Sequence, residues 1–184
     1  MFPKIILKLL DATLLPSLLV FSVKFLSLLC LAVVWRQPFN FDRSGLIFQN
    51  PLDLYQVNSI SNMALLVFTS ACLFFSLIRL RFFTENGLSP LVSARLVNAG
   101  LESFIVSLSQ GYIRVTVWLT LFFSLTLSLL IQGLLGLSPF YLFVFALGFF
   151  TLGVFFFSLS LERDWGGHLD DSAAVVIIEG AEDA

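Results

Sequence analysis

Charged residues are scarce in this chain of 184 residues: they make up 12% of it, against 58% hydrophobic residues. A soluble domain carries about 25% charged residues, and a chain of this length has no single core large enough to hide so much apolar surface from water. The composition therefore excludes an ordinary soluble domain and predicts a protein that uses the lipid bilayer as its solvent. The net charge of −2 provides no basic surface, so we expect no nucleic-acid partner.

Residue types that carry catalysis or bind metals are rare as well. The chain has one histidine, His168, and two cysteines, Cys30 and Cys72, which lie inside apolar runs without a CxxC pattern. We expect these cysteines to be small, buried apolar residues. Because the sequence has no Ser/His/Asp set, no established metal-ligand spacing and no phosphate-binding glycine pattern, we predict no catalytic residue, no metal ligand and no cofactor.

Four apolar stretches approach or reach the roughly 20 residues that a helix needs to cross a bilayer. They lie at residues 14–34, 60–78, 115–131 and 140–161. We therefore predict an all-α, polytopic membrane protein whose four-helix transmembrane domain covers residues 1–161. Residues 162–184 hold seven of the twelve acidic residues, and we predict that they form an acidic polar tail.

The connections between the stretches differ in length. The last two stretches are joined by residues 132–139, where Gly133, Gly136 and Pro139 favour a tight turn and hence an antiparallel hairpin. Residues 35–59 form a longer, aromatic loop that we expect to lie partly along the membrane surface. Short interfacial helices are predicted within residues 84–111 and at residues 3–11, because both segments alternate apolar and polar residues at helical spacing.

The distribution of Lys and Arg near the helix ends predicts the orientation. If the N-terminus is cytoplasmic, that side of the membrane holds seven basic residues: Lys4, Lys8, Arg79, Arg81, Arg95, Arg114 and Arg163. The other side then holds only Arg36 and Arg43. We predict a multi-pass protein with both termini in the cytoplasm, in the inner membrane if the source is prokaryotic.

Lys24 is the most informative single residue, because it lies at the middle of the first apolar stretch. A lysine at the centre of a membrane helix costs about 3 kcal/mol on insertion scales, and the other three stretches contain no Asp or Glu to pair with it. One interpretation is a functional charge: a proton or anion site, or a contact to an acidic residue of a partner subunit. The alternative is a lysine that reaches toward the headgroups or bonds to Ser or Thr.

Two further groups of polar residues are noteworthy. Arg79, Arg81 and Arg114 lie at helix ends on the same predicted side, where they are either lipid-phosphate contacts or ordinary topology anchors. The third stretch carries hydroxyl residues every four positions, which we interpret as an interhelical contact. These residues are Thr116, Thr120, Ser124 and Ser128.

One part of the chain resembles a known family. Pro51-Leu52-Asp53-Leu54 precede an apolar helix that ends in the segment RLRFFTENGLSP, residues 79–90. This pattern is similar to the opening of the horizontally transferred transmembrane domain (HTTM) family, whose members include vitamin K-dependent gamma-carboxylases. The resemblance covers about residues 51–171 and implies a helix within the next loop, two more spans, and a polar segment that corresponds to residues 162–171. It assigns no catalytic lysine, because Lys24 precedes the matched region.

Three functions remain open from the sequence. The first is an accessory, anchoring or assembly subunit of a larger membrane complex, with the lipid bilayer and other membrane protein subunits as its partners. The second is an HTTM-like module linked to an enzyme. The third is a small transporter or channel component that uses Lys24 as its intramembrane charge.

Overall fold

The structure, a computed structural model, describes residues 2–36, 38–42, 45–48, 50–83, 98 and 107–182. Its elements are α1 (Phe2–Val34), β1 (Phe39–Asp42), β2 (Gly45–Phe48), α2 (Pro51–Phe82), α4 (Leu108–Leu134) and α5 (Phe140–Glu182). Four stretches are long and apolar enough to cross a membrane: Ala12–Val34, Pro51–Phe82, Leu108–Leu134 and Phe140–Arg163. The predicted class, a helical membrane protein with four spans, is confirmed.

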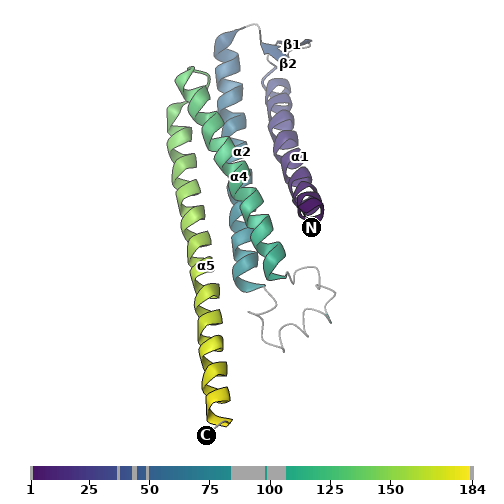
Figure 1. The fold of residues 1–184 in the computed structure, drawn as a ribbon. Helices are drawn as coiled ribbons and strands as arrows, with labels where there is room; N and C mark the ends of the chain where they lie inside the picture. The colour runs from purple at the N-terminus through teal and green to yellow at the C-terminus, as the bar shows by residue number, and fades with distance from the viewer. Residues whose placement is uncertain are drawn as a thin grey trace.

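The helices α2 and α4 form the centre of the bundle (Figure 1). Both α1 and α5 pack against this central pair, with α1 on one side and α5 on the other. The core therefore consists mainly of α2 and α4 residues, among them Leu65, Leu73, Val115, Phe122 and Leu129. The first helix is peripheral: only 6% of its most apolar window is buried inside the protein, against 39% for α2 and for α4.

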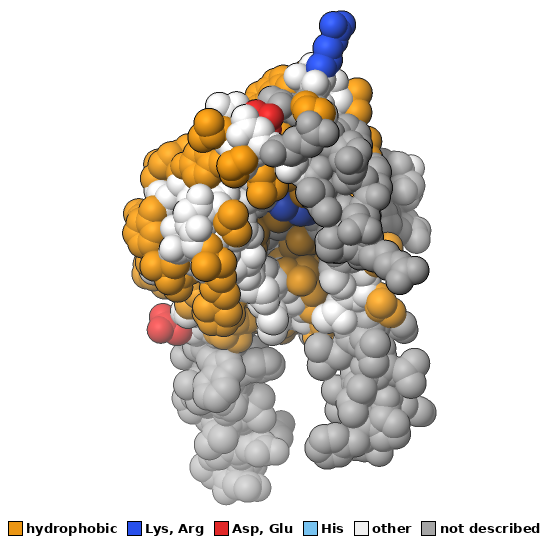
Figure 2. Space-filling view, turned by 90° about the horizontal axis from the view of Figure 1, so that it is seen from above, with side chains coloured by type: hydrophobic (Ala, Val, Ile, Leu, Met, Phe, Trp, Pro, Cys, Tyr) orange, Lys and Arg blue, Asp and Glu red, His pale blue; other side chains and the backbone are white. Residues whose placement is uncertain are grey.

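The outward-facing side chains of the helices are predominantly apolar (Figure 2). Phe21 on α1, Val67 on α2 and Phe145 on α5 are each more than half exposed. In water such a surface would drive aggregation, whereas lipid tails are as apolar as these side chains. The surface thus agrees with the four spans in assigning the bundle to a bilayer.

The turn between α4 and α5 is built on Gly136, which has a positive φ of 70°. The N–H of Leu137 donates to the carbonyl of Gln132 (2.9 Å) and the N–H of Gly136 to that of Gly133 (3.2 Å). This pair of bonds is the Schellman motif, which favours glycine at the position after the helix. Pro139 then precedes the start of α5 at Phe140, so the predicted tight hairpin is confirmed.

Several segments differ from the sequence prediction. Residues 39–42 and 45–48 form two antiparallel strands, in which Phe39 pairs with Phe48 and Asp42 with Gly45. Residues 3–11 continue directly into α1, so the separate N-terminal interfacial helix is wrong. The α5 helix runs past the fourth predicted span to Glu182, through the residues predicted as the acidic tail. The interfacial helix expected within residues 84–111 falls almost wholly outside the described residues.

The second membrane helix begins nine residues earlier than predicted, at Pro51 rather than residue 60. Asn50 is its N-cap, and its side chain accepts a hydrogen bond from the N–H of Leu52 (3.4 Å). Proline at the first helical position and Asp53 in the first turn stabilise this start. The polar residues between Asp53 and Asn62 are therefore helical and belong to the bundle.

Two glycines of α5 provide a test of the packing between α5 and the central pair. A Cβ at Gly153 would lie 2.8 Å from Leu73 Cδ2 and 3.4 Å from Leu119 Cδ2, whereas a Cβ at Gly148 would meet nothing within 4 Å. We expect Gly153→Leu to lower the free energy of unfolding in mixed micelles by about 2 kcal/mol through overpacking. Gly148→Leu is the matched control and should be neutral or stabilising, because leucine is the better helix former. Equal effects of the two substitutions would contradict the close packing of α5 at Gly153.

Candidate functional site

Lys24 points into the bundle and is bound by two asparagines of α2. Its ammonium group donates to Asn58 Oδ1 at 2.9 Å and to Asn62 Oδ1 at 2.5 Å. The two asparagines are four residues apart, which places them on one face of the helix. This spacing allows α2 to present two amide oxygens to a single ammonium group.

The same two asparagines bind the end of α4 and the α4–α5 turn. Asn58 Nδ2 donates to Gln132 Oε1 and to the carbonyl of Leu137, both at 2.9 Å. Asn62 Nδ2 donates to Gln132 Oε1 at 2.8 Å and to Ser138 Oγ at 3.1 Å. Each amide therefore uses its oxygen for Lys24 and its nitrogen for the neighbouring hairpin. We call Lys24, Asn58, Asn62, Gln132 and Ser138 the Lys24 cluster.

A pair of serines adds a further hydrogen bond between α1 and α2. Ser27 and Ser61 share a hydrogen bond of 2.6 Å between their hydroxyl groups. Ser61 also donates to the carbonyl of Lys24 at 3.4 Å, and it is completely buried. The small serine side chains let the two helices approach closely at this level.

The Lys24 cluster contains no carboxylate, and it is part-buried: Lys24, Asn58 and Gln132 are half-buried, whereas Asn62 and Ser138 are buried. Asn62 is 1% exposed and Ser138 is 3% exposed. Among the residues whose side chains the structure describes, only Asp53 and Glu162 are acidic, whereas the ammonium group of Lys24 donates to the amides of Asn58 and Asn62. Neutral amide oxygens thus accept two of the three N–H groups of Lys24, and they do so without cancelling its charge.

Sequence reasoning identified Lys24 but missed its partners. The partners expected for Lys24 were an acidic residue of another subunit or the hydroxyl of a Ser or Thr, and Asn58 was assigned to a loop before the second span. An available signal was the pair of amides four residues apart next to an apolar run, Asn58 and Asn62. The observed bonds resemble the second interpretation, in which polar side chains accept the hydrogen bonds of Lys24. The acceptors are Asn side chains rather than Ser or Thr.

The three arginines lie away from the Lys24 cluster. Arg79 and Arg81 are in the last turn of α2, and Arg114 is on α4 near enough to act electrostatically on Arg79. Arg81 and Arg114 are exposed and Arg79 is half-buried. Seventeen residues of helix separate Arg79 from Asn62, which corresponds to about 26 Å, so these arginines and Lys24 belong to opposite ends of the bundle.

Two smaller expectations need correction. Thr116, Thr120 and Ser124 are exposed, and each hydroxyl donates to the carbonyl four residues earlier in α4. Each hydroxyl thus donates within α4, and the predicted interhelical contact of these three residues is not made to another helix of this chain in the described residues. Cys30 is exposed on α1 rather than buried, because α1 turns most of its surface outward.

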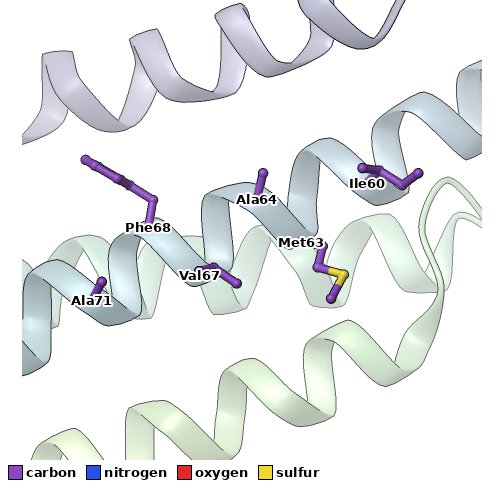
Figure 3. Close-up of a pocket in the computed structure, with 6 residues that line it drawn as sticks. All are labelled: Ile60, Met63, Ala64, Val67, Phe68 and Ala71. Carbon is purple, nitrogen blue, oxygen red and sulfur yellow. The ribbon is translucent and has the colours of Figure 1, made fainter. Parts of the chain in front are cut away.

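A shallow apolar groove lies on α2 between α1 and α5 (Figure 3). It has a volume of about 600 Å³ and is lined by Ile60, Met63, Ala64, Val67, Phe68 and Ala71. These side chains offer no hydrogen-bond donor or acceptor. The groove therefore suits lipid tails, and its lining contains no titratable or catalytic side chain.

Together these features define a polytopic helical membrane protein in which two amides of α2 bind the ammonium group of Lys24. Comparisons with models of protein families, with curated proteins and with solved structures give no match to this chain. The resemblance to the HTTM family therefore stays a prediction.

Proposed function

We propose that this chain is a non-catalytic accessory, anchoring or assembly subunit of a larger membrane complex. The observation that carries the proposal is the way in which Lys24 is used: its ammonium group joins α1 to α2, and through the asparagines to the α4–α5 turn. A cation used in this way positions helices. Within the described part of the chain, no group of His, Cys, Asp or Glu residues lies together in a way that could hold a metal ion.

The exposed surface supports the same proposal. The first helix is held to the bundle by polar bonds near one level and leaves most of its apolar surface outside. Such a helix is available to pack against other membrane proteins, since van der Waals packing and interhelical hydrogen bonds drive association in lipid. The helices α2 and α4 hold α1 in place on one side.

The test is purification of the tagged full-length chain from its native membranes in a mild detergent. We expect it to elute with at least one other membrane protein in a fixed ratio, identified by mass spectrometry. A stable, monodisperse monomer recovered from the same membranes would contradict the proposal.

A transporter or channel component is the second candidate, and one observation favours it. Lys24 has three N–H donors and uses two of them on the asparagines, so one N–H remains for a transported anion. Replacement of Lys24 by Leu should then abolish flux in proteoliposomes without lowering the amount of protein. Flux that persists in Lys24→Leu removes this candidate.

The HTTM-like module is the third candidate. The loop on which this resemblance depends, residues 84–90, lies outside the described residues.

The proposed orientation places both termini in the cytoplasm. In a background of Cys30→Ala and Cys72→Ala, we expect a membrane-impermeant thiol reagent to label Pro38→Cys in intact cells. Glu162→Cys should be labelled only after permeabilisation, because four crossings place residue 162 on the same side as the N-terminus. The reverse labelling pattern would invert the orientation, and labelling of both positions in intact cells would contradict four crossings.

A further inference from the structure

The charge of Lys24 is left without a counter-charge among the described side chains. Two of its three N–H donors bind neutral oxygens of Asn58 and Asn62. Ionisable residues in membrane helices usually pair with one another or with backbone carbonyls, because an isolated charge in lipid is costly. An anion next to the third N–H would complete the site.

The side chains that surround Lys24 indicate which kind of anion suits the site. Beyond Lys24, α1 continues for ten residues to Val34, a rise of about 15 Å. The exposed large side chains of this segment are apolar: Phe25, Leu26, Val33 and Val34. The α4–α5 turn, which bonds to the cluster, also exposes leucines: Leu134, Leu135 and Leu137. The exposed large side chains around Lys24 on α1 and on the turn are thus apolar, which favours a side-chain carboxylate on a spanning helix over a lipid headgroup phosphate as the anion.

The neighbourhood of Lys24 leaves room for such a helix. On α1, Ser17 and Phe21 precede Lys24 at the spacing of one helical face, and both are exposed, Phe21 to 71%. On α4, Ser124 and Ser128 are exposed, and Ser128 Oγ accepts a bond from Gln132, a member of the cluster (3.0 Å). Small hydroxyl residues permit close approach of another helix and offer it hydrogen bonds.

We propose that this face, made of Ser17, Phe21 and Lys24 on α1 with Ser124 and Ser128 on α4, binds a transmembrane helix of a partner protein that carries an Asp or Glu at the level of Lys24. The proposal rests on the assembly function proposed above and adds the chemistry of the partner. The carboxylate accepts the third N–H of Lys24 and supplies the missing negative charge.

A synthetic leucine-rich transmembrane peptide with one Asp at the matching depth is the probe. Its association with the full-length protein is measured by energy transfer in phosphatidylcholine vesicles near neutral pH, beside peptides that carry Asn or Leu instead. We expect the Asp peptide to bind about tenfold more tightly than the Leu peptide, and more tightly than the Asn peptide. In Lys24→Met this preference should disappear. Equal binding of the Asp and Leu peptides, or a preference that survives in Lys24→Met, overturns the proposal.

A second variant keeps the Lys24 cluster intact, in case Lys24→Met disturbs the fold. Ser124→Phe fills the proposed face, and Thr151→Phe on α5 is its matched control, since both residues are exposed and bond to the carbonyl four residues earlier. Only Ser124→Phe should abolish the preference for the Asp peptide, and an equal effect of both substitutions counts against the site. Loss of the preference when phosphatidylglycerol is added would identify a lipid phosphate as the occupant and also overturn the proposal.

The two proposals fail in different ways. A native complex that persists in Lys24→Met would leave the assembly function standing and refute the carboxylate contact. Specific binding of the Asp peptide by a protein that purifies from its own membranes as a monomer would refute the assembly function and leave the binding site.

Discussion

Asn62→Leu is expected to lower the free energy of unfolding in mixed micelles by about 2 kcal/mol. The substitution keeps the size of the side chain but removes one of the two acceptors of Lys24 and the donor to Ser138. A hydrogen bond to a charged group contributes about 1.5–3 kcal/mol, and measured interhelical bonds in membranes fall at the low end of such values. The asparagine is 1% exposed, so water does not replace the lost bonds.

The control for this substitution is Gln56→Leu, about one and a half turns away on the same helix. Gln56 is exposed, and its replacement should change the unfolding free energy by less than about 0.5 kcal/mol. If Asn62→Leu proved as harmless as Gln56→Leu, the amide would not be holding Lys24.

Phe122→Ala is expected to destabilise the bundle by about 3 kcal/mol, the low end of the range for such truncations. Phe122 is completely buried between α2, α4 and α5, and its ring stacks on that of Phe150 with centroids 6.5 Å apart. Transfer of a phenyl ring between lipid and a protein interior contributes little, so the loss comes mainly from the contacts around the cavity.

The matched control is Phe21→Ala on α1, where the side chain is 71% exposed. It should leave the unfolding free energy within about 0.5 kcal/mol of the original value, because lipid replaces the lost contacts. Thermal or detergent-induced unfolding followed by circular dichroism measures both variants. A larger loss for Phe21→Ala than for Phe122→Ala would mean that α4 does not lie at the centre of the bundle.

Hydropathy along the chain was sufficient to predict the helical class and the four spans, because crossing a bilayer is a local property of about 20 consecutive residues. The turn at Gly136 was predictable for the same reason, since a positive φ favours glycine within a few residues of a helix end. Both predictions needed no knowledge of which helices meet.

The partners of Lys24, in contrast, can be predicted only if it is known which helices are in contact and in which register. Asn58 and Asn62 are 34 and 38 residues away in the sequence, and Gln132 is 74 residues from Asn58. The register between helices is set by packing of the whole bundle, so no local pattern states which amide faces the lysine. The same cause explains the late start assigned to α2: Asn58 is of a residue type common in loops, but its bonds to Lys24 on α1 and to Leu137 of the α4–α5 turn stabilise it in a helix.

The β1–β2 hairpin was missed for a different reason. Residues 35–59 are aromatic, and aromatic residues are frequent both in strands and at membrane surfaces. The segment has no two-residue turn signal such as Asn-Gly. Its composition alone therefore does not distinguish a β-hairpin from a loop that lies along the membrane surface.

The central claim is that Lys24 and the amides of α2 stabilise each other inside the membrane. A double-mutant cycle of Lys24→Met and Asn62→Leu, measured as unfolding free energies in mixed micelles, tests it most directly. We expect the double variant to lose at least about 1 kcal/mol less than the sum of the two single losses, because each substitution removes the same bond. Losses that add to within about 0.3 kcal/mol would contradict the account, since the lysine and the asparagine would then act independently.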